Sequence, residues 1–242
     1  MVRGIFIRAC LQAVVVLAPI AALAESGQCQ GWHNLLSSPD IGLAKVTIAP
    51  QVNFIKNASE ADGCPNATAA CLRNSFLAAD DEVITSARQD DYVCAQYVNA
   101  DGLVTTGWLA AAALSDVPAA PVISTTDWDG SWVGNSEQSI MISPGAAYKM
   151  IGIRGEATFG AQDAGRIKRG AVNVGTFFVR LRVKGDNVSF ALGANGGSKP
   201  WAEGGPTECR IAMRRLGSFL LVEDNGRCGG HNVSFTGNYR RS

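Results

Sequence analysis

The stretch Phe177-Phe-Val-Arg-Leu-Arg-Val-Lys184 decides the fold class of this chain, because apolar and basic residues alternate along it. Successive side chains of a strand point to opposite faces of a sheet. One face of this segment is therefore apolar and consists of Phe177, Val179, Leu181 and Val183. The other face is basic and consists of Arg180, Arg182 and Lys184. The pattern predicts a half-buried β-strand whose basic side chains lie outside.

The rest of the second half of the chain has the same character. Gly185-Asp-Asn187 is typical of a turn, and the apolar alternation resumes at Val188. Short segments rich in β-branched and aromatic residues predict about eight strands and no helix, at residues 132–133, 138–143, 148–153, 177–184, 188–192, 208–216, 219–223 and 232–239. Eight antiparallel strands close into a barrel or form a two-layer sandwich, and we expect the barrel.

The first half of the chain also reads as β-structure. Five short segments bounded by turn residues predict strands at 46–49, 52–55, 81–85, 92–98 and 105–109. Residues 69–79 are compatible with either a short helix or a strand. The whole chain is therefore expected to be all-β, with a small barrel followed by a larger antiparallel barrel or sandwich.

The first 24 residues predict an export signal. Two arginines give a positive start, an apolar run follows over residues 9–23, and Ala22-Leu-Ala24 offers small residues for cleavage before Glu25. A membrane anchor is the alternative, but Pro19 interrupts the run before it reaches the ~20 apolar residues that a span requires. We expect a mature protein in the periplasm, or outside the cell, without a membrane span.

Removal of the leader leaves six cysteines, and an even number in an oxidising compartment predicts disulfides. A zinc site is the alternative, but the chain has no Cys-x-x-Cys pair and its two histidines lie far apart. The long gap between Cys94 and Cys209 divides the six into four and two. Within the four, Cys64 and Cys71 close a short loop and elimination leaves Cys29 with Cys94, although four cysteines allow three pairings.

A register argument predicts the remaining disulfide. If Gly217-Ser218 is a two-residue hairpin turn, Leu216 faces Phe219. Counting outward from this turn along both strands places Cys209 opposite Gly226, two positions before Cys228. Residues 224–226 are typical of a turn, which would fold Cys228 back toward Cys209. The Cys209–Cys228 bond is expected to contribute about 3 kcal/mol in the chain-entropy model.

A proline-containing segment at residues 115–126 is expected to link two domains. The predicted organisation is a signal peptide at 1–24, an extension at 25–45, a first domain at 46–114, the linker, and a second domain at 127–242. Residues 25–116 hold 11 acidic and 4 basic residues, a net charge of −7, and residues 117–242 hold 10 and 15, a net charge of +5. The split is either ordinary surface variation or a means of attracting partners of opposite charge.

Several motifs of the first half resemble a bacterial Src-homology-3-like domain of exported proteins. The resemblance covers residues 46–114 and rests on Gly63-Cys-Pro65, Cys71, Asp80-Asp81, Val83-Ile84, Tyr92-Val-Cys-Ala95, Tyr97 and Thr105-Thr-Gly-Trp-Leu109. Asp80 stands where the family usually has glycine, and Ala110 where it usually has proline. The resemblance implies a small disulfide-stapled barrel that binds cell-wall peptides or partner proteins.

The second half is similar to exported proteins of proteobacteria, some of which resemble proteins named as lysozyme inhibitors. The similarity rests on Trp128-Asp-Gly-Ser-Trp132, Leu220-Leu-Val-Glu-Asp-Asn225, Cys228-Gly-Gly230 and Asn232-Val-Ser-Phe-Thr-Gly-Asn-Tyr-Arg240. It implies a periplasmic β domain and transfers no active-site residue.

Two groups of residues are candidates for binding. Three aromatic residues could line a groove for an extended peptide, or belong to the core: Tyr92, Tyr97 and Trp108. Three basic residues could bind an anionic polymer or protein, or simply form the solvent-exposed face of a sheet: Arg180, Arg182 and Lys184. Arg214 and Arg215 are considered as additions to the basic group.

These observations favour a non-enzymatic periplasmic binding or adaptor protein that recognises cell-wall peptide or a periplasmic protein. Catalysis is disfavoured because disulfides would consume the thiols and the two histidines lack an evident nucleophile and acid. The alternatives are an inhibitor of a lysozyme-like wall hydrolase, a carrier of a small apolar ligand inside the second barrel, and a hydrolase. No cofactor, metal or nucleic acid is expected, and the oligomeric state is left open.

Overall fold

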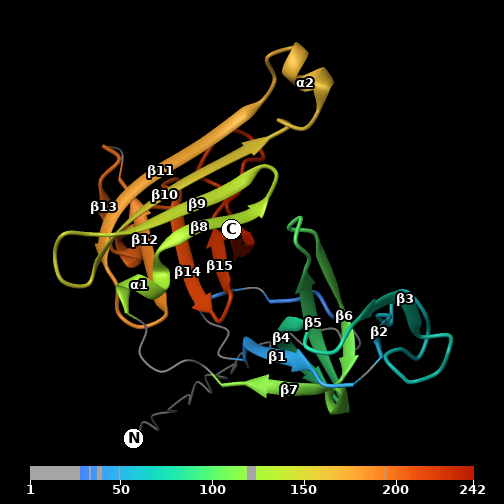
Figure 1. Cartoon of the computed structure of the whole chain (residues 1–242). Helices are drawn as coiled ribbons and strands as arrows, with labels where there is room; N and C mark the ends of the chain where they lie inside the picture. Colours follow the sequence, from blue (N-terminus) through green and yellow to red (C-terminus); the bar gives the residue numbers. More distant parts are fainter. Residues whose placement is uncertain (1–27, 33, 37–39, 49, 119–123, 194) are drawn as a thin grey trace, which may run out of the picture.

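The computed structural model describes residues 28–32, 34–36, 40–48, 50–118, 124–193 and 195–242. The described chain is all-β and forms two antiparallel sheets, one from each half of the sequence (Figure 1). The predicted signal peptide lies outside the described residues. Within these ranges, the only helices are short, and none has the length and apolar character of a membrane span.

The first sheet has seven antiparallel strands in the order β3-β2-β6-β5-β4-β1-β7. Its strands are β1 (Gly42–Val46), β2 (Val52–Ile55), β3 (Leu72–Leu77), β4 (Glu82–Gln89), β5 (Tyr92–Val98), β6 (Val104–Ala110) and β7 (Leu114–Val117). A single 3-10 turn, Ala111–Ala113, precedes β7. Two compact apolar clusters lie one on each face of β5, and the four cysteines of this half belong to one of them.

The first sheet extends beyond the range 46–114 at both ends. Strand β1 lies mostly within the predicted extension, and the edge strand β7 lies mostly within the predicted linker. Both belong to the sheet because β1 pairs with β4 on one side and with β7 on the other. The segment 69–79, for which the sequence allowed a helix or a strand, contains β3.

The second sheet has nine antiparallel strands in the order β11-β10-β9-β8-β16-β15-β14-β12-β13 and curls into a nearly closed barrel (Figure 1). Its strands are β8 (Gly130–Asn135), β9 (Gln138–Pro144), β10 (Met150–Phe159), β11 (Asn173–Arg182), β12 (Asn187–Leu192), β13 (Ser198–Lys199), β14 (Arg210–Leu216), β15 (Phe219–Asp224) and β16 (Gly237–Arg241). Each of the eight predicted segments overlaps a strand, but residues 232–236 precede β16, and the two-residue β13 was not predicted.

Three short helical elements, which the sequence did not predict, accompany the barrel: α1 (Thr125–Trp128), α2 (Ala164–Lys168) and the 3-10 turn Trp201–Glu203. Helix α1 begins with a reciprocal capping box between Ser124 and Asp127. Helix α2 sits at the tip of the long β10–β11 hairpin, which projects from the barrel (Figure 1).

The hairpin register predicted around Gly217-Ser218 is confirmed. Leu216 pairs with Phe219, and Gly217 adopts a positive φ of 58°, which suits glycine at this turn. The structure contains the three expected disulfides, Cys29–Cys94, Cys64–Cys71 and Cys209–Cys228. Each half of the chain is therefore cross-linked by disulfides of its own.

The interior of the barrel is filled by side chains. Its cluster of buried residues includes Trp128, Trp132, Phe190, Phe235 and Tyr239, each at most 2% exposed. Aromatic rings contact each other within it, with the centroids of Phe177 and Phe235 4.9 Å apart. Within the described residues, the interior of the barrel is therefore a packed apolar core.

Tyr239 gives the barrel a measurable pH dependence. Its buried hydroxyl donates a hydrogen bond of 2.7 Å to the carbonyl oxygen of Phe235. Burial, reinforced by the charge of Asp224, raises the pKa of Tyr239 far above its ordinary range. An unfolded tyrosine ionises near pH 10, so above that pH the folded state binds more protons and the free energy of unfolding falls as pH rises.

We expect Tyr239→Phe to be less stable than wild type at pH 8, by about 1–2 kcal/mol, because the Phe235 carbonyl loses its buried donor. The difference should shrink above pH 10, as the wild type loses stability faster than the variant. Chemical denaturation between pH 8 and 11 measures this, with the exposed Tyr148→Phe as the control. Parallel pH profiles for wild type and Tyr239→Phe would contradict the argument.

The two sheets pack against each other through an apolar cluster, which we call the junction cluster. It joins Leu35, Ile41, Leu43, Ile84 and Val98 of the first half to Ala212, Leu216, Phe219 and Leu221 of the second. Hydrogen bonds frame it: the Trp32 indole donates to Asn238 Oδ1 at 2.6 Å, and the Ser218 hydroxyl donates to Glu82 at 2.6 Å. The two halves therefore form a continuous structure with a buried contact.

Candidate functional site

The structure does not bring the three predicted aromatic residues together in one groove. Strands β5 and β6 pair in continuous register, with Cys94 opposite Trp108. Tyr92 and Trp108 consequently share the face that carries the disulfides, and both contact the apolar cluster there. Tyr97 is five residues from Tyr92, an odd spacing, and it packs against the cluster on the other face. Trp108 is only 2% exposed and serves as core.

The predicted basic face is present and exposed. Along β11 the burial alternates as the sequence indicated, with Phe177 and Val179 buried and Arg180 and Arg182 exposed. Lys184 follows the strand and is also exposed. The guanidinium of Arg180 lies 4.8 Å from the ring centroid of Phe178, an exposed aromatic residue on the same face.

Neither Arg214 nor Arg215 belongs to this basic face. Arg214 forms an ion pair of 3.4 Å with Asp186. Arg215, its neighbour in β14, donates to the backbone oxygen of Asp127 beside helix α1. Successive residues of a strand point to opposite faces, so the two side chains take part in different surroundings.

Strand β11 is one end of the sheet, and its outer edge borders the seam where the barrel does not fully close. The first part of this edge is covered, because Gly230 donates its N–H to the carbonyl oxygen of Val174 at 3.1 Å. On the other side of the seam, β12 pairs with β13 only at Ala191 and Leu192. Strands β11 and β13 approach each other without pairing. An isolated antiparallel bridge between Lys184 and Asn187 closes the seam at the turn that joins β11 to β12. The seam is therefore open between this bridge and the short pairing of β12 with β13.

Main-chain groups of both strands face this opening. The odd-numbered Val183 donates its N–H toward β10, whereas the even-numbered Val174 accepts a hydrogen bond on the opposite side. Main-chain hydrogen-bonding groups alternate in direction along a strand, so the even-numbered residues of β11, including Arg180 and Arg182, direct their N–H and C=O groups to the seam. In β12, Leu192 donates to Cys209 on the β14 side, so the odd-numbered Ser189 directs its main chain to the seam. Within the described residues, no strand pairs with these groups.

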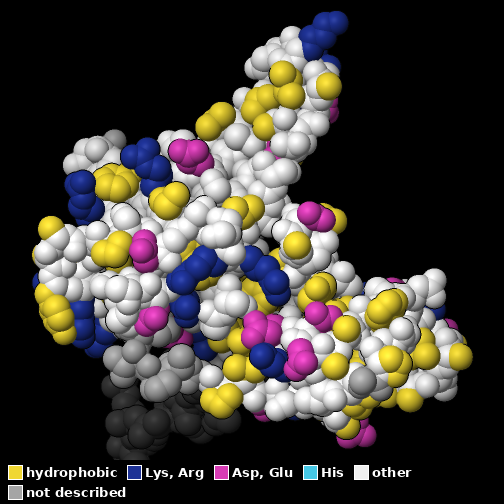
Figure 2. All heavy atoms as spheres, in the orientation of Figure 1, with side chains coloured by type: hydrophobic (Ala, Val, Ile, Leu, Met, Phe, Trp, Pro, Cys, Tyr) yellow, Lys and Arg dark blue, Asp and Glu magenta, His cyan; other side chains and the backbone are white. Residues whose placement is uncertain are grey.

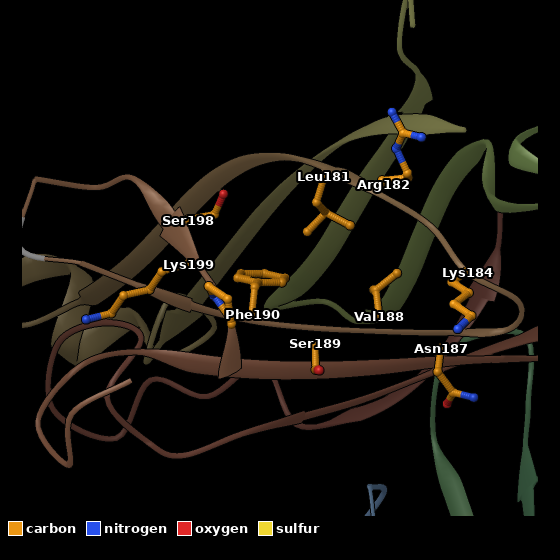
Figure 3. Close-up of a pocket in the computed structure, with 10 residues that line it drawn as sticks. Leu181, Arg182, Lys184, Asn187, Val188, Ser189, Phe190, Ser198 and Lys199 are labelled. Carbon is orange, nitrogen blue, oxygen red and sulfur yellow. The ribbon is translucent and has the colours of Figure 1, made fainter. Parts of the chain in front are cut away.

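A hollow of about 340 Å³ occupies the seam, and we call it the seam pocket. Figure 3 shows the apolar side chains of Leu181, Val188 and Phe190 in its middle. Arg182 and Lys184 lie at one end, and Lys199 lies at the other (Figure 3). The pocket is large enough for a small ligand or a few residues of a peptide.

The charges of the seam pocket are unevenly balanced. Lys199 forms an ion pair of 2.7 Å with Glu208. The Lys199 ammonium and the N–H of Gly205 lower the pKa of the Glu208 carboxyl, so this acid stays ionised. Arg182 and Lys184 form no ion pair among the described residues. The end of the pocket near β11 therefore carries two cations without an internal counter-charge.

Sequence reasoning found Arg182 and Lys184 but missed the apolar floor and Lys199. Leu181, Val188 and Phe190 read as core residues, and the alternation gave no sign that they border an opening. Lys199 lies in a glycine-rich stretch with no strand pattern, and β13 contains only two residues. The sequence did contain one indication of this site: segments 177–184 and 188–192, which alternate strongly and are joined by the turn at 185–187.

Comparison of the chain with protein-family models, curated proteins and solved structures gives no match. Within the described residues, no three His, Cys, Asp or Glu side chains gather as metal ligands. The site combines exposed strand edges, an apolar floor and uncompensated cations.

Proposed function

We propose that the protein is a non-enzymatic binding protein of the periplasm that takes an acidic peptide segment into the seam pocket. The segment would belong to cell-wall peptide or to a periplasmic protein. The observation that carries this proposal is the opening between β11 and β12, where unpaired main-chain groups border a hollow with an apolar floor and two uncompensated cations.

Each part of the pocket supplies a different component of recognition. The free edges of β11 and β12 offer donors and acceptors to an extended main chain, as in peptide recognition by strand addition. The floor of Leu181, Val188 and Phe190 accepts one apolar side chain. Arg182 and Lys184 attract carboxylates and disfavour basic peptides. An extended peptide that alternates acidic and apolar residues satisfies all three components.

The predicted export signal and the three disulfides support the periplasmic location, because disulfides persist in oxidising compartments. The resemblance of residues 46–114 to a Src-homology-3-like domain is consistent with a wall-associated role. We assign binding to the second half because the aromatic residues proposed for the first half are divided between two faces of its sheet.

The test uses a fluorescent peptide, Glu-Val-Glu-Val-Glu, and a matched peptide in which lysine replaces glutamate. We expect the protein to bind the acidic peptide and to ignore the basic one, with affinity falling as salt rises because exposed charges are screened. The double variant Arg182→Ala, Lys184→Ala should bind about tenfold more weakly, which corresponds to about 1.4 kcal/mol. Fluorescence anisotropy measures both effects.

A charge-matched control separates the site from net charge. Lys168→Ala with Arg169→Ala removes two exposed cations from the region of α2, at the far tip of the β10–β11 hairpin, and should leave the affinity unchanged. Ser189→Pro removes a main-chain donor that faces the seam and should weaken binding without removing charge. Equal loss in both double variants, or no binding of the acidic peptide by wild type, would refute the proposal.

A further inference from the structure

A second group of arginines lies away from the seam pocket, at the side of the barrel that faces the first half. Arg215 of β14 and Arg240 and Arg241 of β16 line one cavity of about 260 Å³ together with Trp132 and Ser218. We call these three residues the arginine cluster. Figure 2 shows Lys and Arg side chains gathered in the middle of the molecule, above the junction with the first half.

Two members of the arginine cluster are held close together. Arg215 Nε and Arg241 Nη2 each donate to the backbone oxygen of Asp127 at 2.5 Å, so these two nitrogens are at most 5.0 Å apart. Both guanidinium groups also lie near the Trp132 ring, at 5.9 Å and 4.8 Å from its centroid. A carbonyl dipole and an aromatic ring hold two like charges in place, without a carboxylate between them.

The third member is more isolated. The Arg240 guanidinium lies 4.9 Å from the Phe219 ring centroid, and its Nε is buried without a hydrogen-bond partner. A buried donor that lacks a partner destabilises the folded state, and more so when the group is charged. The cluster therefore contains an unused donor as well as unbalanced charge.

The neighbouring acids do not neutralise the arginine cluster. Among the described residues, none of the three arginines forms an ion pair with a carboxylate. Glu82 accepts from Ser218 at the cavity and pairs with Lys45 at 3.7 Å. The Asp127 carboxylate accepts the N–H of Ser124 at 2.7 Å. Burial lowers the pKa of Arg215, repulsion from Arg241 lowers it further, and Asp127 offsets this only in part.

We propose that this cavity binds a phosphate group, either as the free anion or as part of a larger molecule. Guanidinium groups present planar pairs of N–H donors that match the oxygens of phosphate. A phosphate group carries about −1.5 to −2 charge at pH 7, whereas a carboxylate carries one negative charge, and the cavity is bordered by three cations. The site is separate from the seam pocket in location and in lining residues, so either proposal stands without the other.

Isothermal titration calorimetry of the whole protein tests this proposal with inorganic phosphate, glycerol 3-phosphate and acetate at equal ionic strength. We expect saturable binding of phosphate and no measurable binding of acetate. Binding of glycerol 3-phosphate as well would indicate that a substituted phosphate enters the cavity, and binding of inorganic phosphate alone would restrict the ligand to the free anion.

Variants locate the site. Arg241→Gln removes one charge and should weaken phosphate binding about tenfold, while Arg169→Gln, an exposed residue beside α2, should not change it. Because Arg241 contributes packing against Trp132, the fold of the variant is checked by far-ultraviolet circular dichroism and by its thermal unfolding midpoint, which should both be close to those of wild type. Acetate bound as well as phosphate, or the same phosphate affinity in Arg241→Gln and wild type, would overturn the proposal.

Discussion

Replacing Phe219 by alanine should lower the free energy of unfolding by about 3–5 kcal/mol and separate the unfolding of the two halves. Phe219 is fully buried in the junction cluster, where it lies between the two sheets. Removal of its ring leaves a cavity at the contact that couples the halves. Wild type should unfold in one calorimetric transition and Phe219→Ala in two, with the first sheet and the barrel melting separately.

Two phenylalanines provide matched controls for this result. Phe235 is equally buried but belongs to the barrel core, so Phe235→Ala should cost a similar free energy while altering the barrel transition alone. Phe178 is 45% exposed on the outer face of β11, and its replacement should have a small effect. A single transition in Phe219→Ala, at the temperature of Phe178→Ala, would show that the junction does not couple the halves.

Loss of the Cys29–Cys94 disulfide should have the other large effect. The two residues are 65 positions apart, and in the chain-entropy model a loop of that length stabilises the folded state by about 4 kcal/mol. The bond also anchors the segment that contributes Trp32 and Leu35 to the junction. We expect Cys29→Ser with Cys94→Ser to reduce the midpoint of thermal unfolding by about 10 °C for a protein of this size.

The Cys64–Cys71 disulfide is the internal comparison. Its residues are only seven positions apart, so Cys64→Ser with Cys71→Ser should cost about 2.5 kcal/mol. Neither cysteine belongs to the junction cluster, and neither holds the segment of Trp32 and Leu35, so the halves should remain coupled. If both double variants lose the same stability and keep the same cooperativity, the long loop and its anchored segment have no special role.

Local patterns were sufficient for most of the barrel. The alternation in β11 and β12, and the hairpin between Leu216 and Phe219, depend on neighbours in the sequence, and the structure has the same faces and register. The ends of the first sheet could not be predicted in this way. Strands β1 and β7 are defined by partners far along the chain, so nothing local marked them as sheet rather than extension and linker.

The candidate site was predictable only in part. Arg182 and Lys184 followed from strand periodicity, but the seam depends on which strands lie at the two ends of the sheet. The division of Tyr92 from Tyr97 was visible in the sequence, because an odd spacing on a strand places side chains on opposite faces. The junction was hidden: the residues joined by its Trp32–Asn238 hydrogen bond are 206 positions apart.

The open edge of β11 also bears on how this protein behaves at high concentration. An unpaired strand edge is a template for association with a second copy of the same chain. Antiparallel pairing of two copies through the end of β11 would bring Arg180, Arg182 and Lys184 of each chain against their counterparts, and like charges repel. The cations that would admit an acidic peptide would therefore also disfavour the pairing of two copies at this edge.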